Sequence, residues 1–178
     1  MGDSLTTVLV FFLAAILLFL YPMMTLADRA DDVSQIAIQT ATASFVDNVR
    51  ETGKLTEQNY SAYIGKLGAT GNTFRIELKI QRLDINPSKK AAYENSDTTG
   101  KSTYYNLYTY QIENALSKDS EGNNGVIYLK KGDVFSTSVV NTSETLSASM
   151  KKFMYKVTGN SLYNLSADYS GIILTNGQ

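Results

Sequence analysis

The stretch LTTVLVFFLAAILLFLYPMMTLA, residues Leu5–Ala27, runs directly into DRADDVSQIAIQTATASFVDNVRE, residues Asp28–Glu51. The first segment carries no charge, and at a rise of about 1.5 Å per residue it would form about 34 Å of helix. That length is sufficient to cross a hydrocarbon core of about 30 Å. The second segment is polar and rich in Ala and Thr. We therefore predict one long helix over 5–51, whose first half lies in a membrane and whose second half leaves it.

Two other structures could contain such an apolar run, namely a buried core helix and a cleaved signal peptide. A core helix of this length would show a polar face, and a signal peptide would show a basic n-region and a shorter apolar core. The residues before Leu5 are Met-Gly-Asp-Ser, without Lys or Arg. We expect a retained, single-pass membrane helix, with the short N-terminal tail inside and the C-terminal domain outside.

Two features mark the predicted helix along its length. Pro22 lies near the outer end of the apolar run, where it removes one backbone hydrogen bond and is expected to kink the helix. Past the run, apolar and mostly small residues recur at spacings of three and four, which is typical of one helical face. The face comprises Leu26, Ala30, Val33, Ala37, Ala41, Phe45 and Val49. Gly53 is a plausible stop signal.

The middle of the chain changes from helical to strand periodicity. Thr56 is expected to cap a helix over 57–67 that turns Tyr60, Tyr63, Ile64 and Leu67 inward. Phe74, Ile76, Leu78 and Ile80 then alternate with polar residues, which predicts a strand with one wet face. The segment Thr103–Lys118 fits both a helix and, in its Tyr-rich part, a strand; we predict a helix.

The last third of the chain predicts a hairpin, a helix and a strand. The runs Val126–Leu129 and Val134–Val140 flank a turn that contains Gly132, which indicates a β-hairpin. Thr142 or Ser143 would cap a helix that ends at Gly159. Its apolar face would be Leu146, Met150, Phe153 and Val157. A final strand would place Tyr163, Leu165, Ala167, Tyr169, Gly171 and Ile173 on one side.

These elements predict an α+β fold with a long N-terminal transmembrane helix and a small domain. That domain would contain an antiparallel sheet and three further helices, with the sheet packed against the long helix. We divide the chain into a tail and transmembrane helix (1–27), an amphipathic extension of the same helix (28–53) and an extracytoplasmic α+β domain (54–178).

Composition argues against several classes of function. The chain has no Cys and no His, so thiolate nucleophiles, Cys-ligated metal and the serine-hydrolase triad are absent. Charge is balanced, with 16 Lys and Arg against 17 Asp and Glu, so no basic field would attract nucleic acid. The acidic loop Asp119–Asn124 lacks the spacing of a helix–loop–helix calcium site. We expect no catalytic residues, no metal and no cofactor, and hence not an enzyme.

Twelve tyrosines and no tryptophan form a noticeable bias. Tyr104, Tyr105, Tyr108 and Tyr110 cluster, and such a cluster could stack on sugars or on a protein partner. The simpler interpretation, which we prefer, is that about half pack inward and the others lie amphipathically on the surface.

The whole chain resembles TadE-like pseudopilins, small membrane-anchored minor pilins of tight-adherence pilus systems in clostridial-type bacteria. The resemblance lies in MGDSLTTVLVFFLAAILLF, DRADDVSQIAIQTATASFVDNVRETGKLTEQNY, GATGNTF and LKKGDVFSTSVVN. The family pattern places Glu five residues after a leader Gly, where this chain has Thr7. Asp3 is the nearest acid, and in such an assembly it would pair with the N-terminal amine of a neighbouring subunit, because unpaired charge in lipid is costly.

The resemblance implies a pilin-like α+β fold and a structural component of a pilus or secretion-type assembly that acts by helix–helix packing. Its partners would be membrane lipid and other pilin-like subunits or assembly-platform proteins. Small residues allow close helix contact in lipid. The residues expected to serve assembly are Asp3, Pro22, Ala30, Val33, Ala37 and Ala41. The alternative is a membrane-tethered extracytoplasmic module that binds a glycan or a protein, with the helix as a plain anchor.

Overall fold

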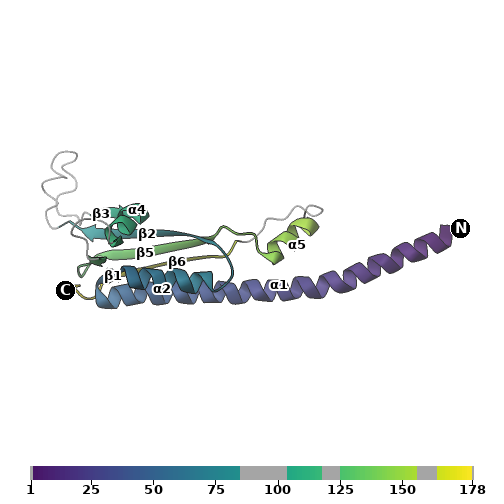
Figure 1. The fold of residues 1–178 in the computed structure, drawn as a ribbon, viewed down its shortest axis with the longest axis horizontal. Helices are drawn as coiled ribbons and strands as arrows, with labels where there is room; N and C mark the ends of the chain where they lie inside the picture. The colour runs from purple at the N-terminus through teal and green to yellow at the C-terminus, as the bar shows by residue number, and fades with distance from the viewer. Residues whose placement is uncertain (1, 85–103, 118–124, 156–163, 178) are drawn as a thin grey trace, which may run out of the picture.

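A computed structural model describes residues 2–84, 104–117, 125–155 and 164–177, and the side chains of residues 4–152 and 164–177 within those ranges. It confirms an α+β fold with a long N-terminal apolar helix, further helices and antiparallel sheets (Figure 1). The elements in chain order are α1 (Gly2–Thr52), β1 (Lys54–Thr56), α2 (Glu57–Gly68), β2 (Phe74–Leu83), β3 (Tyr104–Tyr108), α4 (Thr109–Leu116), β4 (Val126–Tyr128), β5 (Val134–Asn141), α5 (Leu146–Tyr155) and β6 (Ser166–Ile172).

Helix α1 is continuous over 51 residues and stops at the predicted glycine. Gly53 has a φ of 66°, a left-handed conformation that favours residues without a Cβ. A Cβ at Gly53 would lie 2.4 Å from the carbonyl oxygen of Thr175. The carbonyl of Gly53 accepts a hydrogen bond from Leu129 N at 2.8 Å. The end of α1 is thus packed tightly against two later segments of the chain.

Helix α2 begins where the sequence predicts. The Thr56 hydroxyl accepts a hydrogen bond from Asn59 N at 3.1 Å, which satisfies one of the free N–H groups of the first turn. Tyr63 and Leu67 are buried as expected. The prediction for Ile64 is wrong, since its side chain is 44% exposed. Its position on the helix faces solvent beside the stripe that packs on α1.

The main sheet has the order β3-β2-β5-β6, with every neighbouring pair antiparallel. The predicted hairpin is wrong: β4 pairs with β1 in a separate two-stranded sheet, whereas β5 pairs with β2 and β6. The turn itself does form, with Gly132 at a φ of 98°. The buried Asp133 carboxylate accepts Lys130 N at 2.9 Å and Leu83 N at 3.1 Å, which ties the turn to the end of β2.

The helix predicted over 103–118 is correct only in its second half. Tyr104–Tyr108 forms strand β3, which pairs along the outer edge of β2 from Lys79 to Leu83. Aromatic residues are common in strands. The pairing also provides hydrogen-bond partners for the backbone groups at the edge of β2, which a helix could not do because its own backbone groups are already bonded to each other. Beyond the end of β3, the Thr109 side chain forms hydrogen bonds with the next backbone groups along the edge of β2. Its hydroxyl accepts from Leu78 N at 2.8 Å and donates to Leu78 O at 3.3 Å.

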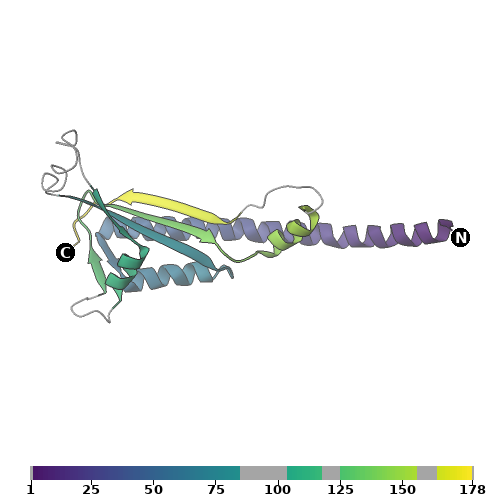
Figure 2. The ribbon, with the colours of Figure 1, turned by 90° about the horizontal axis from the view of Figure 1, so that it is seen from above.

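One face of the sheet packs on the C-terminal half of α1, with α2 beside it (Figures 1 and 2). Phe45 lies at the centre of this layer, stacked on Tyr63 at 4.3 Å between ring centroids and edge-on to Phe135 at 5.6 Å. The largest fully buried side chains among the described residues come from α1, the sheets and the shorter helices, and comprise Ile38, Val46, Val49, Leu55, Leu67, Leu78, Ile80, Ile112, Leu129, Phe135, Val139 and Ile173. Residues 38–49 of α1 therefore belong to the same core as the sheet.

The end of the chain differs from expectation at the start of α5. Thr145, and not Thr142 or Ser143, caps the helix, since its hydroxyl accepts from Ala148 N at 3.1 Å. Leu146, the first residue of the predicted apolar face, is 63% exposed. Val157 and Gly159 lie outside the described residues, as does Tyr163. In and beside β6, the predicted inner side is confirmed for three residues that are buried, Leu165, Ala167 and Ile173.

Candidate functional site

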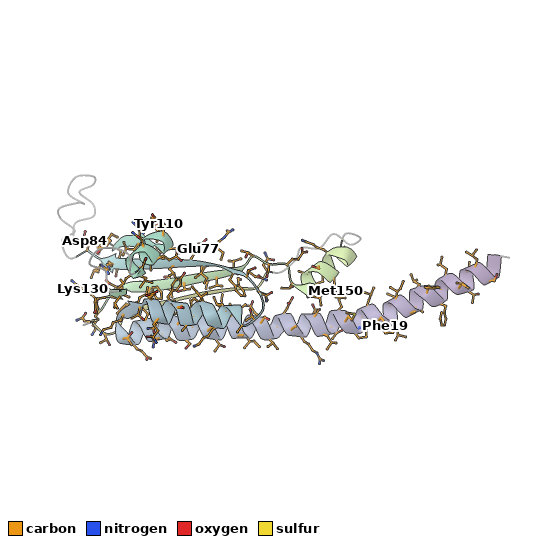
Figure 3. All side chains as sticks on the ribbon, viewed as in Figure 1. Phe19, Glu77, Asp84, Tyr110, Lys130 and Met150 are labelled. Carbon is orange, nitrogen blue, oxygen red and sulfur yellow. The ribbon has the colours of Figure 1, made fainter. Side chains whose placement is uncertain are left out.

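The N-terminal half of α1 projects from the domain as an apolar arm (Figures 1 and 3). Its side chains are largely exposed, for example Phe11 at 76% and Phe19 at 73%. Among the described residues, α1 alone is long and apolar enough to cross a membrane, and its most apolar window has no residue buried inside the protein. A helix of this kind at the N-terminus also fits a signal sequence. The domain leaves the arm free to contact lipid or other helices.

Pro22 lies within α1, and the helix continues through it. The ring removes the N–H that would bond to Leu18 O four residues earlier. One turn further, the Thr25 hydroxyl donates to Tyr21 O at 3.0 Å, a side-chain contact that often accompanies a bent helix. Figure 1 shows a gentle bend of α1 between the arm and the domain.

The predicted small-residue face of α1 divides into two parts. Ala30, Val33 and Ala37 are exposed, whereas Ala41 is half-buried and packs against the core. We call the exposed part, Leu26, Ala30, Val33 and Ala37, the seam. Asp3 lies in the first turn of α1, and its side chain is outside the described set. The structure thus separates the seam from the stripe that holds the domain.

The stripe of α1 that contacts the domain is centred on residues that the predicted face omitted. Ile38, Thr42 and Val46 are fully buried. The Thr42 hydroxyl donates to Ile38 O at 2.7 Å, and with its proton so placed it accepts from the Tyr63 hydroxyl at 3.0 Å. Because Thr42 is polar, the spacing of apolar residues alone does not predict this stripe. Burial raises the pKa of the Tyr63 phenol to about 12.

A polar junction joins α1 to α5 where the apolar arm ends. The Asp28 carboxylate accepts from Ser147 Oγ at 2.5 Å and forms an ion pair with Lys151 Nζ at 2.6 Å. Thr145 Oγ1 donates to Asp31 Oδ2 at 2.9 Å. The hydrogen bond from Lys151, followed by that from Ser147, lowers the pKa of Asp28 below its ordinary value. These contacts set the position of α5 along α1.

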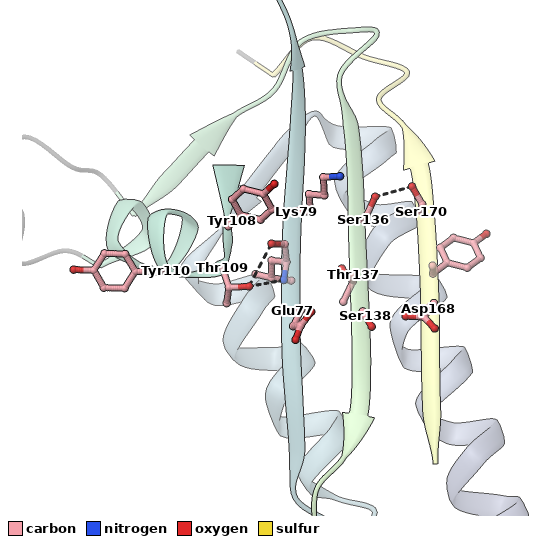
Figure 4. A pocket seen from close by; sticks show the side chains of 12 residues that line it. Glu77, Lys79, Tyr108, Thr109, Tyr110, Ser136, Thr137, Ser138, Asp168 and Ser170 are labelled. Carbon is pink, nitrogen blue, oxygen red and sulfur yellow. Dashed lines mark hydrogen bonds between the residues drawn. The ribbon is translucent and has the colours of Figure 1, made fainter. Parts of the chain in front are cut away.

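The outer face of the main sheet carries a shallow depression of about 600 Å³ (Figure 4). Alternation along β2 places Glu77 and Lys79 on this face, as the polar half of the strand pattern predicts. Tyr110, 80% exposed, borders the depression from α4. Ser136 and Ser170 are hydrogen-bonded across the strands at 2.8 Å. Sequence reasoning identified the tyrosine cluster but could not bring it together with β5 and β6, because strand order is not local.

No group of His, Cys, Asp and Glu that could hold a metal occurs in the part of the chain that the structure describes. The acidic loop Asp119–Asn124 lies outside that part. A scan against protein-family models finds no match to the chain, and searches of curated proteins and of solved structures find no significant match. The geometry therefore carries the functional argument alone.

Proposed function

We propose that the chain is a membrane-anchored, pilin-like structural subunit, of minor-pilin or pseudopilin type, that acts by packing its long helix against neighbouring subunits. The observation that carries this proposal is that the two halves of α1 have different surroundings. One continuous helix leaves its N-terminal half uncovered and supplies, from residues 38–49, part of the core of the domain. Such a helix transmits any lateral contact of the arm directly to the domain.

The seam supports lateral packing of α1 against other helices. Ala30, Val33 and Ala37 are exposed although they are apolar or small, and they continue the exposed surface of the arm beyond the apolar run. Small side chains let helix backbones approach closely, and van der Waals contacts then stabilise the pair. The partners would be other pilin-like subunits or assembly-platform proteins, with the domain outside the membrane.

The seam is tested by the double variant Ala30→Leu/Ala37→Leu. Both positions are exposed, so the domain should fold normally while added bulk separates the helices. Gln39→Leu is the matched control, because successive helical residues are about 100° apart and Gln39 lies on a different exposed side. Site-specific cross-linking between copies in cells should fall strongly in the double variant alone. Equal cross-linking in all three proteins would contradict the proposal.

A second experiment separates a subunit from a plain anchor. Replacing residues 5–27 by an unrelated membrane helix leaves an anchor functional and removes the native packing surface of a subunit. Loss of cross-linking and of co-purifying partners favours the subunit. Protease added to intact cells should cleave the domain; full protection of the domain would contradict its placement outside.

The depression on the sheet supports a second candidate function, a membrane-tethered module that binds a glycan. It combines an exposed phenol ring with carboxylate, amine and hydroxyl groups, the mixture that sugar sites use. Tyr110→Ala should abolish binding of the detergent-solubilised chain to purified wall glycan. Tyr104→Ala, an exposed tyrosine of β3 outside the depression, is the control and should bind normally. Failure of the unmodified chain to bind the glycan would eliminate this candidate.

A further inference from the structure

The segment that follows β6 lies against the C-terminal end of α1, at the end of the domain farthest from the apolar arm (Figure 1). Leu174 N donates to Arg50 O at 3.0 Å, and Gly177 N donates to Leu129 O at 2.9 Å. We call residues 174–177 the latch, because these bonds tie the segment to the last turn of α1 and to the residue that follows β4.

Two glycines let the latch approach the end of α1 backbone to backbone. A Cβ added at Gly53 would lie 2.5 Å from Gly177 N, and a Cβ added at Gly177 would overlap Gly53 O. Well-packed carbon atoms stay about 3.5–4.0 Å apart, so neither backbone has room for an additional atom. The position of Gly177 is therefore fixed by packing as well as by its hydrogen bond.

The next residue pair in this segment, Asn176–Gly177, is of a chemically reactive type. When an Asn–Gly pair is free to move, the glycine nitrogen attacks Cγ of the asparagine, a cyclic imide forms, and the side-chain nitrogen leaves with the N–H proton as ammonia. Glycine permits this attack because it has no Cβ beside the nitrogen. Water then opens the imide at either carbonyl and gives aspartate or isoaspartate. In isoaspartate the main chain passes through the former side chain and is one carbon atom longer.

The closed latch blocks the first step of this reaction. Leu129, whose carbonyl holds the N–H of Gly177, is only 1% exposed, and the Asn176 Oδ1 accepts from Lys131 N at 2.8 Å. The nitrogen thus keeps its proton, and the side-chain amide is held in place. Short segments with few hydrogen bonds open locally far more often than a whole domain unfolds. Asn176 is exposed, so water and base reach the pair as soon as the latch opens.

We propose that Asn176–Gly177 is a modification site that the closed latch protects and that deamidates when the latch opens. Isoaspartate then prevents closing, because the additional carbon displaces the glycine by about 1.5 Å from its tightly packed contacts. Aspartate, the other product, keeps the original chain path and retains an acceptor for Lys131 N. Isoaspartate is therefore a lasting covalent mark of chains in which the end of α1 has been uncovered. This inference depends neither on the membrane span nor on the seam.

The first test compares the full chain in detergent with a synthetic peptide of residues 170–178, which is too short to fold. Isoaspartate is measured over days in mildly alkaline buffer. Peptide mapping separates Asn176 from the other Asn–Gly pair, Asn124–Gly125, whose asparagine lies outside the described residues. We expect Asn176 to deamidate at least about tenfold more slowly in the folded chain than in the peptide. The chain unfolded in urea should match the peptide. A folded chain as fast as the peptide, or an unfolded chain as slow as the folded one, would refute the protection.

A matched pair of variants at Lys131 tests the side-chain contact. Asp133 N donates to Lys130 O at 3.0 Å and Gly132 has a φ of 98°, as in a type II turn, where proline is common at the second position. Lys131→Pro therefore keeps the turn but removes the N–H that holds Asn176, whereas Lys131→Ala keeps that N–H. We expect several-fold faster deamidation in Lys131→Pro alone. Equal rates in the two variants would show that this contact does not protect the pair.

The effect of isoaspartate is tested on the aged chain. Chains that carry isoaspartate are separated from unmodified chains by chromatography, and their hydrogen exchange is compared with that of Asn176→Asp. We expect the amides of Gly177 and Lys131 to exchange at least about tenfold faster in the isoaspartate chain, and near the unmodified rate in Asn176→Asp. If these two proteins exchange alike, the additional carbon does not hold the latch open and the proposal is refuted.

Discussion

The side chain of Gln35 on α1 pairs with the backbone of Ser166 at the start of β6. Its Nε2 donates to Ser166 O at 2.6 Å, and its Oε1 accepts from Ser166 N at 3.2 Å. The amide group thereby replaces a neighbouring strand at the outer edge of the sheet. At the other end of β6, Arg50 Nε donates to Ile172 O at 3.2 Å. Helix α1 thus covers both ends of an edge strand that would otherwise be open to pairing.

We predict that Gln35→Ala lowers the free energy of unfolding by about 1–3 kcal/mol, because two hydrogen bonds to a partly buried backbone are lost. Gln39→Ala, an exposed glutamine on the same helix, should change it by less than about 0.5 kcal/mol. Urea unfolding in detergent measures both, and faster hydrogen exchange of the Ser166 amide should accompany the first. Equal effects of the two substitutions would show that the pair does not stabilise the sheet edge.

Gly53 and Gly65 should respond in opposite directions to alanine. Gly53→Ala forces a Cβ into a left-handed residue and against Thr175 O, and should cost about 2 kcal/mol or more. Gly65 lies exposed in α2 with nothing within 4 Å of an added Cβ. Gly65→Ala should therefore stabilise by about 0.5–1 kcal/mol. Thermal unfolding of both variants is the measurement, and a stabilising Gly53→Ala would contradict the tight end of α1.

Alkaline pH should destabilise the domain through Tyr63. Its pKa is about 12 in the folded chain against 10.0 ordinarily, so the stabilisation is complete below pH 10 and declines as pH rises from 10 toward 12. Tyr63→Phe keeps the ring on Phe45 and should flatten this decline, at a cost near neutrality of about 1 kcal/mol. Tyr60 retains part of the dependence, because burial and then the hydrogen bond to Glu113 also raise its pKa. An unchanged pH profile in the variant would refute the assignment.

The junction between α1 and α5 should open in acid. The pKa of Asp28 is lowered from 3.8, so its contribution is present above pH 3.8 and is lost as pH falls through the lower folded value. Asp28→Asn should loosen α5 by about 1 kcal/mol at neutral pH, with faster hydrogen exchange at Ala148–Lys152. Asp32→Asn, at an exposed position one turn away, is the control. Identical exchange in both variants would show that Lys151 and Ser147 do not hold α5.

Local signals predicted those parts of the fold that depend on neighbouring residues. The apolar run, the stop at Gly53, the cap at Thr56 and the alternation of β2 each need only a few adjacent residues to specify a structure. The division of 103–118 into β3 and α4 was missed because its early tyrosines become a strand only when the edge of β2 lies beside them. The same holds for the candidate sites. The seam lies on one helix and is predicted by residue spacing, whereas the depression on the sheet is formed by several elements and is not.

By itself the sequence determined that α1 is one helix with an apolar first half, because an uncharged run of that length and composition has few other stable structures. Tertiary structure decided which side of α1 faces the sheet. Apolar residues occur on more than one side between Leu26 and Val49, and packing selected Ile38 and Val46 with the polar Thr42 between them. It also decided that β4 pairs with β1 and β5 with β2, since backbone groups of all strands are alike and only the shared core distinguishes their partners.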